Sequence, residues 1–187
     1  METKQIAASF DTAVETFVEY ISVTFDTTFN LISDLIEGAL TGIEQVFLFL
    51  PFYLVILIFG LLAWKTAGKG MAVFTVVGFF LCQAMGLWDE TMVTMALAVT
   101  AVIFTLIFAI PLGIAAGSNQ KVSDTTRVLM DFIQTMPPYV YLIPAIAILG
   151  FGASPAITAT AIVAFAPAVR LTALGIRGVP REHIEVG

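Results

Sequence analysis

The residues that could carry out chemistry in this sequence are few and stand apart from one another. His183 is the only histidine, and no cluster of carboxylates or cysteines accompanies it. Metal binding and acid–base catalysis need several such groups together, so neither is predicted. Cys82 is the only cysteine and lies in an apolar run, so no internal disulfide can form and a small buried side chain is favoured. No glycine-rich stretch ends in Gly-Lys-Ser/Thr, which indicates that ATP is not bound by this chain.

Composition assigns the chain to the lipid bilayer. Apolar residues make up 59% of the 187 residues and charged residues only 12%, with a mean hydropathy of +0.98. A water-soluble domain carries about twice that share of charged residues. The net charge of −6 argues against binding to nucleic acid. We therefore predict an integral membrane protein.

Five apolar stretches are long enough to be transmembrane helices, since a bilayer requires about 20 apolar residues. None of them contains Asp, Glu or His, which argues against an intramembrane enzyme. The predicted fold class is all-α, with an amphipathic N-terminal helix followed by about five spans. These spans are residues 46–64, 70–88, 91–117, 136–152 and 155–175, with a turn at 152–155 between the last two.

The cations predict the orientation of these spans. Seven of the eight Lys and Arg residues lie in or beside the connections 65–69 and 118–135 or at the end of the fifth span. Acidic residues lie on the other side, at 89–90 and before the first span. The positive-inside rule places the cation-rich side in the cytoplasm, so we predict an external N-terminus.

Residues 11–44 have a helical period of polar residues, with steps of three and four, and an apolar opposite side. The pattern predicts one amphipathic helix, or two with a break near residues 38–42. Eight of the fourteen acidic residues precede residue 45. The segment therefore lies either on the outer membrane surface, which we favour, or against other protein.

Proline and glycine separate the last three spans from the first two. Pro111, Pro144 and Pro167 interrupt apolar helices, which a membrane bundle tolerates when neighbouring helices satisfy the freed carbonyls. Gly113 and Gly117 form a small-xxx-small pair that permits close approach of another helix. The first two spans have bulky residues all round and are predicted to be peripheral, with a boundary near residue 90.

The connection 118–144 is predicted to form a short helix that ends at the double proline Pro137–Pro138, because proline disfavours α geometry in the preceding residue. Such a break is either an ordinary loop-to-helix junction or irregular backbone that lines a path. Tyr139 and Tyr141 point to different helix faces, and interfacial anchoring accounts for one of them.

Arg170 lies near the end of the fifth span. A role in a substrate path is one interpretation, but snorkelling or an interhelical contact is favoured.

Three quoted segments, "IPLGIAAG", "MDFIQTMPPYVYLIPAIAILGFG" and "FAPAVRLTALGIRGVPREHIE", resemble the permease subunit of binding-protein-dependent ABC importers. The branch that handles glycine betaine, proline and choline is the most similar. The resemblance covers residues 90–187. Together with the charge and span patterns above, it predicts three regions: an extracytoplasmic acidic amphipathic region (1–45), two peripheral anchor helices (46–89) and the first part of a permease core (90–187).

In that family a short cytoplasmic helix with a Glu-Ala-Ala…Gly motif docks in a cleft of the ATPase subunit. "VPREHIEVG" resembles its first turns, with Glu185 at the acidic position, and the sequence ends inside the motif; Val186 and Gly187 depart from the small residues usual there. The resemblance therefore implies an ATPase-coupling role for a set of residues near the end of the chain: Arg177, Pro180, Arg181, Glu182, Glu185 and Gly187.

The resemblance further implies a bacterial inner-membrane subunit that imports an osmoprotective quaternary amine, with no cofactor of its own. Its expected partners are an ATPase subunit that holds ATP, an extracytoplasmic solute-binding protein and a second permease copy. Candidates for lining the path are Pro137, Pro138, Tyr139, Tyr141 and Phe165. The alternatives are a non-transporting membrane scaffold or assembly protein, and an ABC permease for another amino-acid-like solute.

Overall fold

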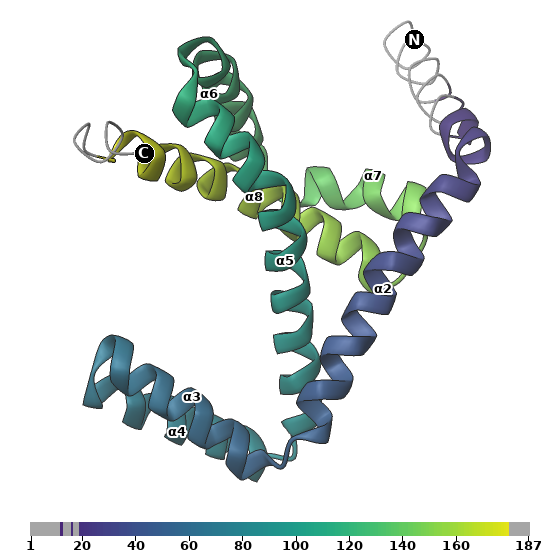
Figure 1. The fold of residues 1–187 in the computed structure, drawn as a ribbon. Helices are drawn as coiled ribbons and strands as arrows, with labels where there is room; N and C mark the ends of the chain where they lie inside the picture. Colours follow the sequence, from purple (N-terminus) through teal and green to yellow (C-terminus); the bar gives the residue numbers. More distant parts are fainter. Residues whose placement is uncertain (1–11, 13–15, 17–18, 180–187) are drawn as a thin grey trace, which may run out of the picture. The chain divides into compact units, whose positions relative to one another are not determined.

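The computed structural model describes residue 12, residue 16 and residues 19–179, and every regular element in these residues is an α-helix (Figure 1). This confirms the predicted all-α class. The helices are α2 (Asp26–Phe49), α3 (Phe52–Ala67), α4 (Lys69–Ala84), α5 (Trp88–Ser118), α6 (Gln120–Thr135), α7 (Tyr139–Leu149) and α8 (Ala153–Arg177).

The described residues form two compact units. One contains the chain up to Glu37 together with everything from Ala101 onward, and the other contains Gly38–Thr100. The candidate site residues all belong to the first unit, so each unit is described by itself.

In the first unit, α5 and α8 cross in close contact and point in the same general direction. A Cβ atom on Gly113 would lie 2.5 Å from the Cβ of Thr172, and one on Gly117 would lie 2.7 Å from the Cβ of Ile176. Both pairs are four residues apart on each helix, so the helices point in the same direction. The predicted close approach at the two glycines is confirmed.

Next to this crossing lies the core of the first unit. Ala109 from α5, Met130 from α6, and Ala166 and Val169 from α8 are buried against one another. α6 has the strong amphipathic pattern expected of a helix with one packed face, and its N-terminus is capped by Asn119, whose side chain accepts a hydrogen bond from the Lys121 amide (2.9 Å).

The double proline ends α6 as predicted. Met136 takes an extended conformation (φ −87°, ψ 136°), and α7 starts after Pro138 at an angle of 92° to α6. α7 has only 11 residues, about 16 Å of helix, because glycines with positive φ follow it at Gly150 and Gly152. The turn before α8 thus begins at residue 150 rather than 152.

The second unit contains a hairpin of α3 and α4 joined at Gly68 (Figure 1). Gly68 has φ +88°, which favours glycine. A Cβ on Gly60 would come within 2.9 Å of Val76, and the rings of Phe59 and Phe79 lie 5.6 Å apart, so the two helices pack tightly.

Two sequence predictions differ from the structure in this region. The span predicted at 46–64 is divided by Pro51, and α2 and α3 meet at 101° there, because proline removes a backbone donor and disfavours helix at the preceding residue. The alternative break near residues 38–42 is not present, since α2 continues through Gly38 and Gly42. A glycine inside a helix costs only about 1 kcal/mol, which a long helix tolerates.

Among the described helices, α5 and α8 are individually long and apolar enough to cross a membrane. The bent pairs α2–α3 and α6–α7 bring the number to four if each is one span, and α4 is a further apolar helix of 16 residues. The count of five spans therefore stays a prediction.

Candidate functional site

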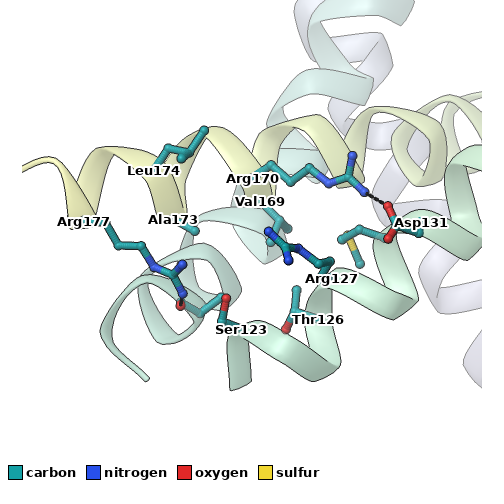
Figure 2. Close-up of a pocket in the computed structure, with 11 residues that line it drawn as sticks. Ser123, Thr126, Arg127, Asp131, Val169, Arg170, Ala173, Leu174 and Arg177 are labelled. Atoms are coloured by element: carbon teal, nitrogen blue, oxygen red, sulfur yellow. Dashed lines mark hydrogen bonds and ion pairs between the residues drawn. The ribbon is translucent and has the colours of Figure 1, made fainter. Parts of the chain in front are cut away.

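Three arginines gather where α5, α6 and α8 meet. Arg127 of α6 and Arg170 and Arg177 of α8 line a cavity of about 300 Å³ (Figure 2). Met130 and Val169, both buried, form part of its apolar wall, and Asp131 is the one carboxylate among its lining residues.

Arg170 makes an interhelical contact, one of the two roles favoured from the sequence. Its guanidinium donates to Asp131 Oδ1 (2.5 Å) and to Gln134 Oε1 (2.6 Å), which fastens α8 to the exposed side of α6. The hydropathy pattern of the sequence gave no reason to expect Asp131 as the partner of Arg170.

Arg177 ties α8 to the end of α5. Its Nη2 donates to the carbonyl of Ala116 (2.9 Å). Ala116 belongs to the last turn of α5, whose carbonyls have no partner within the helix, so the arginine satisfies an acceptor that would otherwise need water. Of the predicted coupling residues, Arg177 is the one that the structure describes. Pro180, Arg181, Glu182, Glu185 and Gly187 lie outside the described residues.

The corner between α6 and α7 brings together four of the five predicted path-lining residues. Pro137, Pro138 and Tyr139 are exposed there. Tyr141 is half-buried, and its hydroxyl donates to the carbonyl of Ile133 (2.7 Å), in the last turn of α6. The two tyrosines therefore do lie on different faces, and Tyr141 stabilises the bend.

Phe165, the fifth candidate, lies half-buried beside the core and lines an apolar cavity of about 640 Å³. Ile133 lines the same cavity, which connects it to the corner that Tyr141 braces. Most other lining groups are aliphatic or aromatic side chains of α2, α5 and α8. Two threonines are the exceptions. Thr105 Oγ1 lies 2.7 Å from the Ala101 carbonyl and 3.3 Å from the Ala161 carbonyl, so its single hydroxyl hydrogen is shared between these acceptors, and Thr158 Oγ1 is buried without a partner among the described residues.

A polar junction that the sequence did not reveal joins α2 to the start of α8. Ser33 Oγ donates to Ser154 Oγ (2.9 Å), which is fully buried. Ser154 Oγ lies 3.1 Å from Glu37 Oε1 and 3.2 Å from the Ser33 carbonyl, so it donates to one of these acceptors at a time. Part of the polar stripe of residues 11–44 thus packs against protein, the alternative that the sequence analysis did not favour. A lone serine after Gly152 gave no signal of this contact.

Nowhere in the described part of the chain do three His, Cys, Asp or Glu side chains gather in a way that could hold a metal ion. The features of these residues that bear on function are the contacts between helices, the two cavities and the cluster of three arginines.

Comparison with known proteins confirms the sequence resemblance. Residues 109–187 match the family described as "Binding-protein-dependent transport system inner membrane component". This segment contains α6, α7, α8 and the C-terminal part of α5, so every candidate site residue lies within it.

Three relatives match over most of the chain. The glycine betaine transport system permease protein OpuAB of Bacillus subtilis is 37% identical over 172 residues, which is 92% of this chain and 61% of the relative. The glycine betaine/proline betaine transport system permease protein ProW of Escherichia coli is 35% identical, covering 94% of this chain and 49% of the relative. The glycine betaine/carnitine transport permease protein GbuB of Listeria monocytogenes is 36% identical, covering 86% and 58%.

The chain thus spans about half to three fifths of the length of these relatives. The family match and the apolar helices together indicate a multi-pass membrane protein.

Proposed function

We propose that this chain, whose residues 109–187 belong to the binding-protein-dependent transport inner membrane component family, is the membrane-spanning part of an importer for a betaine-like quaternary amine. The observation that carries the proposal is the 35–37% identity to glycine betaine permeases over more than nine tenths of the chain. The common direction of α5 and α8 agrees with this assignment. Between them the predicted topology has one span, which crosses the membrane in the opposite direction, so α5 and α8 must point the same way.

The proposed partners follow from the same family. Transport against a gradient needs an energy source, and no phosphate-binding loop is encoded here, so ATP hydrolysis is assigned to a separate cytoplasmic ATPase. Capture of the solute is assigned to an extracytoplasmic binding protein, and a second permease copy is expected to complete the transporter.

The proposed orientation rests on the cations. Arg127, Arg170 and Arg177 all line one cavity at the ends of α5 and α8, and Lys65 and Lys69 flank the α3–α4 turn. By the positive-inside rule these groups face the cytoplasm, which puts the N-terminus and the junction at Ser154 on the outside.

The proposed coupling segment begins where α8 ends. Arg177 is anchored to α5 through Ala116, so a force applied to the residues that follow it, including Glu185, would reach α5 and α8 together. We expect Glu185→Lys in the complete gene product to abolish uptake while the protein remains in the membrane. His183→Ala, two residues away, is the matched control and should transport normally.

The experiment that tests the function is uptake of radiolabelled glycine betaine into vesicles that contain the complete gene product, its ATPase and its binding protein. ATP-dependent accumulation is expected. A membrane scaffold would purify with partners without accumulating solute, and a permease for another solute would accumulate an amino acid but not the betaine. Either result would contradict the proposal.

A further inference from the structure

The cationic cavity between α6 and α8 has more positive charge than its internal contacts use. Its described lining residues include three guanidinium groups and one carboxylate, an excess of two positive charges among residues 19–179. Arg170 is paired with Asp131, whereas Arg177 donates to a neutral carbonyl. Arg127 makes no hydrogen bond or ion pair with any described residue.

Hydroxyl groups lie beside these cations. Ser123 and Thr126 line the cavity, and within residues 19–179 neither side chain makes a hydrogen bond. In Figure 2 the Arg127 side chain extends from α6 toward α8, into the region between Arg170 and Arg177. Guanidinium groups with hydroxyl donors nearby are groups that bind a phosphate, because guanidinium matches its oxygens bidentately.

The rest of the cavity is apolar, which favours a phospholipid over a free phosphate ion as the source of the phosphate. Met130 is fully buried and Val169 is 1% exposed, and both line the cavity together with Ala173 and Leu174. A free phosphate ion would gain nothing from these side chains. A phospholipid would use both parts, with its headgroup on the arginines and the start of its acyl chain on the apolar wall.

The position of the cavity along the helices agrees with this chemistry. Ala116 and Arg177 lie in the last turns of α5 and α8, the two described helices that can individually cross a bilayer. The ends of such helices lie at the depth of the lipid headgroups. Basic pockets between transmembrane helices at this depth are suited to anionic headgroups.

We propose that the cavity lined by Arg127, Arg170 and Arg177 binds the phosphate of an anionic membrane phospholipid. Arg127 supplies the free guanidinium, Ser123 and Thr126 supply hydroxyl donors, and Arg170 and Arg177 are held in place by α6 and α5. The proposal does not depend on which solute is transported, so a failure of the uptake experiment would leave it standing.

The test uses the 187-residue chain purified in neutral detergent and native mass spectrometry with added phosphatidylglycerol. Arg127→Gln is the informative variant because it removes no hydrogen bond or ion pair between described residues, so folding is expected to be unaffected; circular dichroism checks this. Lys121→Gln is the matched control, since it removes the same charge from the same helix at an exposed position outside the cavity lining. The expected result is about tenfold weaker lipid binding by Arg127→Gln, the factor for losing one charge-assisted hydrogen bond, and less than twofold for the control.

Two further arms identify the source of the phosphate. Phosphatidylcholine, which is zwitterionic, should bind more weakly than phosphatidylglycerol, and millimolar inorganic phosphate should displace little lipid. If inorganic phosphate displaced the lipid from the wild-type chain but not from the Arg127 variant, the cavity would be a phosphate site whose ligand is the free ion, which would overturn the assignment to a lipid. Equal binding of both lipids, or equal loss in the Arg127 and Lys121 variants, would overturn the proposal.

Discussion

The close contact between α5 and α8 predicts that a single methyl group at Gly113 destabilises the protein. In Gly113→Ala the new Cβ would lie 2.5 Å from the Cβ of Thr172, 2.8 Å from its Cγ2 and 3.0 Å from the carbonyl oxygen of Val169. Carbon atoms prefer separations of about 3.5–4.0 Å, so the shortfall is about 1.0–1.5 Å. The nearest atom is next to the backbone of α8 and cannot rotate away, so the helix itself must shift.

The size of the effect follows from two opposing terms. Overpacking costs about 1–3 kcal/mol, and a clash with an atom attached to the backbone belongs at the upper end. Alanine is about 1 kcal/mol better than glycine inside a helix. The net loss in the free energy of unfolding is therefore about 2 kcal/mol, which lowers Tm by about 4–8 °C for a chain of this length.

The assay is thermal unfolding of the purified chain in detergent, followed by circular dichroism. Gly78→Ala is the matched control, because Gly78 lies inside α4 with no described atom within 4 Å of an added Cβ; it should unfold at or above the wild-type temperature. Thr172→Gly removes the clashing Cβ and should rescue Gly113→Ala, with a coupling of about 2 kcal/mol, whereas Thr172→Ala keeps that atom and should not. A Gly113→Ala protein as stable as Gly78→Ala would refute the close approach.

Three further outcomes are expected. Ser154→Ala should lower the free energy of unfolding by about 1–3 kcal/mol, because it leaves Ser33 and Glu37 without their partner, while Thr160→Ala, on the exposed side of α8, should change it little; equal effects in a thermal melt would contradict the junction. Asp131→Asn should cost at most about 1 kcal/mol, because the side chain is 62% exposed, and the difference should shrink in high salt; a larger, salt-independent loss in the same melt would disagree with this. A reporter enzyme fused before residue 10 should behave as external and one fused at Lys69 as internal, and the opposite pattern would reverse the proposed topology.

Local backbone features were the part of the fold that the sequence predicted best. The helix preceding the double proline ends at Thr135, and Gly113 and Gly117 do permit a close helix contact. Each of these predictions depends on residues within four positions of one another in the sequence and on a steric rule that holds in any fold.

Partners across the bundle could not be predicted. Gly113 indicates that another helix approaches closely, but nothing in the sequence identifies Thr172 of α8 as the residue that it contacts. Ser33 and Glu37 belong to a polar stripe that equally suits water, and only the fold brings Ser154 to them. The break at Pro51 was missed for another reason. Hydropathy is averaged over a whole span, so a single residue that lacks a backbone N–H donor does not change it.

The small residues buried in α5 explain why this fold depends so much on such contacts. Within the first unit, the packed side of α5 has Ala101, Thr105 and Ala109, whereas large side chains such as Leu106 and Phe108 are exposed. In a bilayer an exposed leucine loses nothing, because lipid is as apolar as a protein core, so burying large apolar groups does not drive these helices together. Close backbone approach and hydrogen bonds such as that from Thr105 to the carbonyl of Ala161 take that role. The bundle should consequently tolerate loss of bulk at its lipid-facing positions far better than addition of bulk at its small ones.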